Sequence, residues 1–250
     1  MSTHRFYVTP LHAAGELPDD QSHHARDVLR LHADESIILF DGHGQWASAQ
    51  LNIQKRVALY NLTGPIHLDP PPLYPITIAS AVPKGDRSHF LLEQISQLGV
   101  ARLVWLDCRY SVVHPVAEAG KMDKWRRLAI ESAKQCGRSR LLNIAPPLTP
   151  EDLLATPEFN HAVIWTHTTA SETLRQRLTA WLAREAAIAE SQSSHGITIL
   201  IGPEGGWSQH ECEILAAVSQ PVQLGNHILR IETAATACAA IAQSLMPAKQ

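Results

Sequence analysis

Two glycine-bearing segments in the last third of the chain carry the residue types best suited to chemistry. One holds Arg230, Glu232 and Thr233, which are a cation, a carboxylate and a hydroxyl within four residues. An arginine can orient a polar acceptor or stabilise developing negative charge, and a glutamate can act as a general base. The other, Gly202–Gly206, contains Glu204 as a second candidate base.

Each of these segments follows a predicted strand. Ile197–Ile201 precedes the first and Val222–Leu224 precedes the second, which continues into a predicted helix over Glu232–Leu245. Ligands bind at the carboxyl ends of strands in an open α/β sheet, and glycines let the backbone approach them closely. The start of a helix also offers free N–H groups. We therefore predict one shared pocket, although a plain turn into a helix capped by Ser208 would also explain the first segment.

Several common chemistries lack their motifs in this sequence. There is no Gly-Lys-Ser/Thr after the glycine loop, no G-x-G-x-x-G, no G-x-S-x-G and no H-E-x-x-H. The 14 histidines are scattered and no two cysteines form a C-x-x-C pair. We predict no metal site, and we expect the cysteines to be reduced thiols. These cysteines are Cys108, Cys136, Cys212 and Cys238.

Composition indicates a globular protein with a local basic region. The chain has 250 residues, 45% of them hydrophobic, and a net charge of −3. Its apolar runs are strand-sized and its N-terminus has no signal-peptide pattern, so we expect a soluble, cytoplasmic protein without a membrane segment. Lys121–Arg140 contains seven basic residues and two acidic ones, which fits either a solvated helix face or an RNA-facing surface.

The pattern of predicted elements divides the chain into domain 1–72 and domain 73–250. The first is predicted to be β-rich, with a hairpin turn at Asp41–Gly44, and we expect its strands to close into a small barrel. A proline-rich stretch, His67–Pro75, marks the boundary. Strands and helices then alternate, which predicts an α/β fold with a parallel sheet. The predicted strands are 76–82, 102–107, 162–166, 197–201 and 222–224, and the predicted helices are 87–98, 121–136, 151–154, 172–187, 209–218 and 232–245.

Basic side chains at strand ends and in the basic region are candidates for gripping RNA phosphates. Ordinary solvated turns and surface salt bridges explain them about equally well. The residues predicted to contact RNA are Arg5, Arg26, Arg30, Lys84, Arg87, Arg126 and Arg138.

At these positions the chain resembles the bacterial 16S ribosomal RNA uridine-N3 methyltransferases of the RsmE type, of the SPOUT class. The resemblance runs nearly end to end, and the combination of motifs is specific although no single motif is. The matching segments are Arg5–Tyr7, His24–Arg30, Lys84–Arg87, Leu98–Val100, Trp125, Glu131–Arg138, Ile201–Gly206, Leu224–Gly225 and Ile228–Thr233.

The resemblance implies a PUA-like N-terminal barrel and a SPOUT domain whose C-terminal segment forms a trefoil knot. It also implies a homodimer that transfers a methyl group from S-adenosyl-L-methionine to 16S rRNA, giving m3U1498, on the 30S subunit. Arg230 and Glu232 are the predicted catalytic residues, with Glu204 as the alternative base. The predicted cofactor-binding residues are Thr166, His167, Ile201, Gly202, Pro203, Glu204, Gly205, Gly206, Leu224, Gly225, Ile228, Leu229 and Thr233.

Four positions depart from the family pattern. Gln94 and Gln97 stand where Lys and Glu are usual, Ile231 replaces a frequent Thr, and Tyr110 interrupts an Arg-Ser pair. Two other interpretations stay open: a non-catalytic RNA-binding module, or a methyltransferase of the same class that acts on another RNA. Cofactor binding separates the first from catalysis, and mapping the modified nucleotide tests the second.

Overall fold

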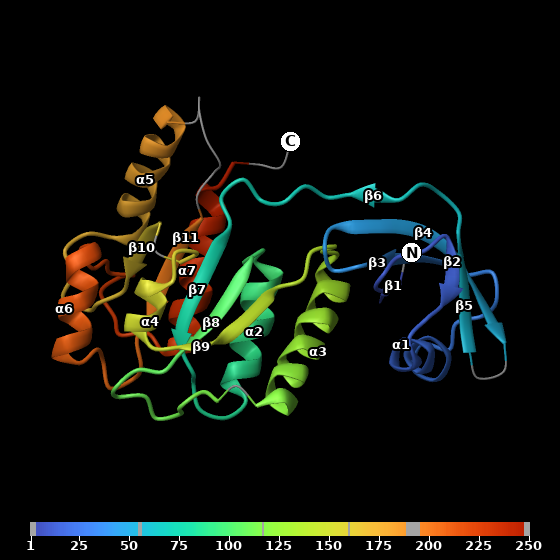
Figure 1. Cartoon of the computed structure of the whole chain (residues 1–250), viewed down its shortest axis with the longest axis horizontal. Helices are drawn as coiled ribbons and strands as arrows, with labels where there is room; N and C mark the ends of the chain where they lie inside the picture. Colours follow the sequence, from blue (N-terminus) through green and yellow to red (C-terminus); the bar gives the residue numbers. More distant parts are fainter. Residues whose placement is uncertain (1–3, 55–56, 117, 160, 189–195, 248–250) are drawn as a thin grey trace. The chain divides into compact units, whose positions relative to one another are not determined.

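The structure is a computed structural model that describes residues 4–54, 57–116, 118–159, 161–188 and 196–247 (Figure 1). The chain forms two compact units. The first consists of Met1–Pro71 together with Ile130–Leu141, and the second of Pro72–Ala129 together with Leu142–Gln250. No single cut in the chain therefore separates them. No helix in the described part is both long and apolar enough to cross a membrane.

The first unit is built on one six-stranded sheet. Its strands pair in the order β1-β3-β4-β5-β2, and β6 pairs with β4. Among the strand pairs that the structure describes in this sheet, only β1–β3 is parallel. Alternate residues of β4 are buried, as expected for a strand with one face on a core. The elements are β1 (Arg5–Tyr7), β2 (Ala14–Glu16), α1 (Asp19–His23), a π-helical turn (His24–Val28), β3 (Ser36–Phe40), β4 (Gln45–Gln54), β5 (Val57–Leu62) and β6 (His67–Leu68).

The predicted hairpin turn at Asp41–Gly44 is present between β3 and β4. Asp41 Oδ1 accepts hydrogen bonds from the backbone N–H groups of His43 (2.7 Å) and Gln45 (3.0 Å). Gly44 has a φ of +108°. A Cβ on it would lie 2.7 Å from the Arg140 guanidinium and from the Asp69 carbonyl oxygen. Only glycine fits this position.

A distant segment, Ile130–Leu141, belongs to the first unit. Arg5 Nη2 donates to Ser139 Oγ (3.0 Å), and Arg140 donates through Nε (3.1 Å) and Nη2 (2.7 Å) to the Asp69 carbonyl oxygen. This segment includes the C-terminal part of α3 (Ala119–Cys136). One helix therefore contributes to both units.

The second unit is an α/β structure on a fully parallel five-stranded sheet of order β10-β11-β7-β8-β9, which confirms the predicted fold class. All side chains of β7 and β11 are buried, as is usual for central parallel strands. The remaining elements are β7 (Ile76–Ala81), α2 (Arg87–Gln97), β8 (Arg102–Leu106), β9 (Asn143–Leu148), α4 (Pro150–Ala155), β10 (Ala162–Trp165), α5 (Leu174–Ile188), β11 (Ile197–Ile201), α6 (Gln209–Val218) and α7 (Ile231–Leu245).

The observed elements differ from the predicted ones in two places. β9 contains Pro146 and Pro147 and was not predicted, but it is an edge strand, where proline costs no ladder hydrogen bond on the outer side. The predicted strand Val222–Leu224 is wrong, because it makes only isolated bridges, from Val222 to Thr166 and from Gln223 to Thr173.

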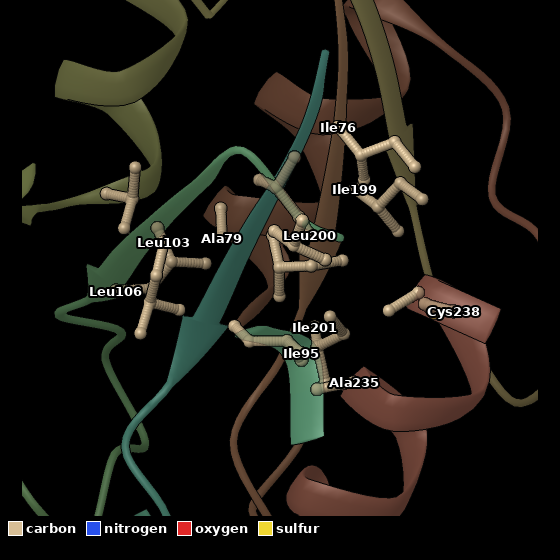
Figure 2. Packing of buried hydrophobic residues seen from close by; sticks show 14 of the residues in the cluster. Ile76, Ala79, Ile95, Leu103, Leu106, Ile199, Leu200, Ile201, Ala235 and Cys238 are labelled. Carbon is tan, nitrogen blue, oxygen red and sulfur yellow. The ribbon is translucent and has the colours of Figure 1, made fainter. Parts of the chain in front are cut away.

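The Ala-rich helix α7 packs tightly on the sheet and on α2. Ala235, Cys238 and Ala239 are fully buried and recur at helical spacing, so one face of α7 is apolar and small. Figure 2 shows Ala235 beside Ile95 of α2 and Ile201 at the end of β11. This packing fixes the start of α7 next to the strand that leads into the first glycine segment.

Candidate active site

Both glycine-bearing segments line one cavity of about 500 Å³ in the second unit. This volume lies within the usual range of small-molecule sites. The lining comes from two strand-end segments, 166–168 after β10 and 201–207 after β11, from segment 222–229, and from Ile231 and Ala234 of α7. The cavity therefore opens at the carboxyl end of the sheet, where α/β folds bind ligands.

Close packing around Gly202–Gly206 leaves no room for side chains at two of its glycines. A Cβ on Gly202 would lie 2.7 Å from the Trp207 ring, and a Cβ on Gly205 would lie 2.8 Å from Tyr110 Cβ. Trp207 also lines the cavity, and its Nε1 donates to the Thr166 carbonyl oxygen (2.9 Å). Trp207 is absent from the predicted site. Its place directly after two glycines was the only signal available.

The first segment leads into α6 through a complete capping box. Ser208 Oγ accepts from Glu211 N (3.3 Å) while Glu211 Oε2 accepts from Ser208 N (2.7 Å). The second oxygen, Glu211 Oε1, accepts from Arg109 N (2.8 Å). Glu211 is 6% exposed, so this glutamate holds two loops together from a buried position. A plain capped turn thus accounts for the helix start but not for the cavity beside it.

The second segment is held at the end of β10 by backbone hydrogen bonds. Val222 N donates to the Trp165 carbonyl oxygen, and His167 N donates to the Val222 carbonyl oxygen, both at 2.9 Å. Beyond this anchor, Ile228 is 86% exposed although it lines the cavity. An apolar side chain left in solvent at a cavity wall is suited to contact with a ligand.

Thr166 and His167 form the third wall, as predicted for the closing side of the pocket. Thr166 Oγ1 donates to the Leu200 carbonyl oxygen (3.2 Å). His167 Nδ1 lies 2.8 Å from Thr169 Oγ1, which orients the imidazole ring. Both residues line the cavity.

The predicted catalytic residues Arg230 and Glu232 and the predicted cofactor-binding residue Thr233 do not line the cavity. Arg230 is the N-cap residue, is exposed, and makes no side-chain cap. Thr233 is also exposed, whereas Glu232 is 6% exposed. Of the two candidate bases, Glu204 lines the cavity and Glu232 does not.

Arg87, which we predicted as an RNA contact, lies between these two carboxylates. Its Nη1 is 3.6 Å from Glu232 Oε1 and its Nη2 is 3.8 Å from Glu204 Oε1. Arg87 Nε donates to the Lys84 carbonyl oxygen (3.2 Å). Glu232 Oε2 is buried and has no hydrogen-bond partner within the described residues. The structure thus joins a loop predicted to hold RNA to both candidate bases.

The other residues predicted to contact RNA differ in their exposure and in their contacts with the rest of the protein. Lys84 and Arg126 of the second unit are exposed. Arg5 is half-buried, and burial lowers the pKa of its guanidinium. The carbonyl oxygen of Arg138 accepts from Arg5 Nη2 (3.3 Å), and burial likewise lowers the pKa of the Arg138 side chain.

Two further predicted RNA contacts lie at the helical turn of the first unit. Arg26 pairs with Asp27 through Nε–Oδ1 (2.9 Å) and Nη2–Oδ2 (2.5 Å), and this hydrogen bonding lowers the pKa of Asp27 to about 2. Arg30 is exposed and has a φ of +54°, an uncommon backbone conformation for an arginine.

No group of three or more potential metal-ligating side chains occurs among residues whose positions the structure gives.

Comparison with known protein families agrees with this geometry. A family model described as an RNA methyltransferase domain matches residues 69–243, and one described as an RNA methyltransferase PUA domain matches residues 17–56. A ribosomal RNA small subunit methyltransferase E of Synechocystis is 30% identical over 247 residues, covering 97% of this chain and 78% of the relative. The chain belongs to the ribosomal RNA small subunit methyltransferase E family.

Other members of this family are similar over most of their length. One from Rickettsia conorii is 29% identical, over 87% of this chain and 84% of the relative. A crystal structure of a ribosomal RNA small subunit methyltransferase E from Neisseria gonorrhoeae, bound to S-adenosyl methionine, is 26% identical. It covers 98% of each chain with a TM-score of 0.79. Family membership thus agrees with the resemblance inferred from the sequence motifs.

Proposed function

We propose that this protein uses S-adenosyl-L-methionine to methylate N3 of a uridine in 16S rRNA, giving m3U1498 on the 30S subunit. The observation that carries the proposal is the single cavity lined by both glycine-bearing segments. Family membership supports the reaction class, and the resemblance supplies the nucleotide.

The residues around the cavity fit such a cofactor. The volume of about 500 Å³ suits a small molecule, and the glycines at 202, 205 and 206 expose backbone groups where a Cβ would clash or strain the chain. When bound, the cofactor supplies an electrophilic methyl group on a positively charged sulfur. We assign its binding to the backbone of Ile201, Gly202, Gly206, Leu224, Gly225, Ile228 and Leu229, with Thr166 and His167 closing one side.

The chain's own contribution to chemistry is to orient uridine and to accept its N3 proton. We assign proton acceptance to Glu204, because this residue lines the cavity, whereas Glu232 does not and is buried beside Arg87. A positioned general base contributes about 10²- to 10⁴-fold to rate. Arg230 lies between the cavity-lining residues Leu229 and Ile231, so we assign it to holding the uracil ring or its developing anion.

Contacts to the larger substrate are assigned to exposed cations. Lys84, Arg126 and Arg30 are exposed, and each can neutralise an rRNA phosphate. We further propose a homodimer that acts in the cytoplasm, as the resemblance implies. Light scattering of the purified protein tests the dimer.

The deciding experiment is methylation of 30S subunits from a strain that lacks this protein, with the modified nucleotide mapped. We expect one m3U in 16S rRNA, formed only with S-adenosyl-L-methionine present. A product on another nucleotide would contradict the target, and a protein that binds RNA without forming any methylated product would be a non-catalytic module.

The pocket assignment is tested separately by Gly202→Ala. The new methyl group would overlap the Trp207 ring, so we expect cofactor binding about tenfold weaker or worse by calorimetry. Gly64→Ala is the matched control, because no atom lies within 4 Å of a Cβ at that position. Equal affinity in both variants would refute this binding site.

A further inference from the structure

We propose that Arg87 is a positioning residue that holds the Glu204 carboxylate at the cavity, with buried Glu232 as its counter-charge. This inference rests on the proposed function, in which Glu204 accepts the N3 proton. It replaces the RNA contact first predicted for Arg87, and it gives Glu232 a role other than that of the base.

Arg87 is suited to this role by its place in the fold. It is the first residue of α2, and its Nε is fixed by a hydrogen bond to the Lys84 carbonyl oxygen (3.2 Å). Its two terminal nitrogens then lie near different carboxylates, Nη1 near Glu232 (3.6 Å) and Nη2 near Glu204 (3.8 Å). A guanidinium is a planar, rigid fork, so fixing one nitrogen directs the other two.

Glu232 is not among the residues that line the cavity. Ile231 and Ala234 of α7 line the cavity. Glu232 follows Ile231 directly, so its side chain leaves the helix about 100° around the axis from that of Ile231. Its side chain is 8% exposed. In the described chain, Arg87 is its only cationic partner, and one of its carboxylate oxygens has no hydrogen bond. A buried carboxylate in this state favours keeping a cation beside it.

Glu204 differs from Glu232, because it is more exposed and is carried by a glycine-rich loop. Its side chain is 35% exposed, and two glycines follow it. Within the described residues, the contact with Arg87 is the only ion pair or hydrogen bond of the Glu204 side chain. The three side chains thus form a series from the buried start of α7 to the cavity wall: Glu232, Arg87, Glu204.

This arrangement predicts which kinetic constant each residue affects. Without Arg87, Glu204 would still border the cavity but would no longer be held in one direction. We expect Arg87→Ala to lower kcat about 10- to 100-fold, with the cofactor Kd within about twofold, since positioning acts on the proton transfer. Arg87→Lys keeps the charge but not the fork, so it should recover part of the rate.

The test is a double-mutant cycle on the full-length protein, with 30S subunits as substrate. In a Glu204→Gln background, Arg87→Ala should lower kcat by less than about twofold further, because its effect passes through Glu204. Arg175→Ala, an exposed arginine near the start of α5, is the matched control and should leave kcat unchanged. Unchanged cofactor binding shows that each variant is folded.

Two results would overturn the proposal in distinguishable ways. If Arg87→Ala raises the KM for 30S subunits and keeps its full effect in the Glu204→Gln background, Arg87 contacts RNA and the positioning role is wrong. If Glu204→Gln alone methylates at the wild-type rate, the base assignment under the proposed function fails, and this inference fails with it.

Discussion

The starts of helices α6 and α7 present the same residue type in two different conditions. Glu211 lies in the first turn of α6 and Glu232 in the first turn of α7, and each is 6% exposed. Both oxygens of Glu211 accept backbone hydrogen bonds. Glu232 has one oxygen 3.6 Å from Arg87 and one that lacks any partner among the residues described.

Equal burial therefore does not imply an equal role. Glu211 caps α6 at Ser208 and also accepts from Arg109 N in the loop after β8, so both of its carboxylate oxygens are hydrogen-bonded. The start of α7 has no side-chain cap, and its glutamate pairs with Arg87, which also pairs with the cavity-lining Glu204. A buried polar group whose bonding is incomplete is the one to examine for function.

The largest expected effect is on stability. Glu211→Gln leaves one backbone N–H facing an amide N–H₂ in a buried place, so we expect the free energy of unfolding to fall by about 2–3 kcal/mol. Glu232→Gln removes a charge that has no hydrogen bonds to lose, and we expect a fall below about 1 kcal/mol.

Urea denaturation of both variants measures this difference. If Glu232→Gln is the more destabilising of the two, the stronger structural role assigned to Glu211 is wrong.

A smaller effect is expected at the N-cap positions themselves. Ser208→Ala removes a side-chain cap and should cost about 1 kcal/mol of stability. Arg230→Ala removes no cap, and we expect a change within about 0.5 kcal/mol while methylation falls. Thermal unfolding and methyl transfer, measured on the same preparations, separate the two. A stability loss in Arg230→Ala equal to that in Ser208→Ala would contradict the distinction.

The smallest expected effect is on the reactivity of the Cys212 thiol, next to Glu211. Burial, followed by the charges of Glu211 and Glu213, raises the pKa of Cys212. Removing one charge in Glu211→Gln lowers that pKa, so a larger share of the thiol is ionised at pH 8. Alkylation of Cys212 by iodoacetamide should then be faster, on the order of twofold, by peptide mass spectrometry. Glu232→Gln serves as the control and should leave the rate unchanged, whereas no acceleration in Glu211→Gln would show that Glu211 is not a cause of the raised pKa of Cys212.

Local sequence signals predicted the scaffold around these helices well. The apolar run Ile197–Ile201 is a fully buried strand, and α6 begins after Ser208, with Glu211 three residues later as a capping box requires. β9 was not predicted because two prolines argue against a strand unless its place at the sheet edge is known.

From the sequence, the backbone segments that line the cavity could be predicted, but the side-chain contacts beside it could not. Glycines after predicted strands indicate a pocket, and both segments do line one cavity, although Val222–Leu224 is not a strand. The ion pair between Arg87 and Glu232 joins residues far apart in the chain, and no spacing rule connects them. The trefoil knot implied by the resemblance stays a prediction, because it depends on the path of the whole chain and not on any local pattern.

The membership of Ile130–Leu141 in the first unit has a consequence for synthesis of the protein. The ribosome completes Met1–Pro71 about 70 residues before it reaches Leu141. At about 5–20 residues per second, this leaves a delay of roughly 4–14 s. During that delay Arg5 has no Ser139 hydroxyl to meet and the Asp69 carbonyl oxygen has no Arg140. The N-terminal unit therefore finishes folding only after translation has passed the middle of the chain.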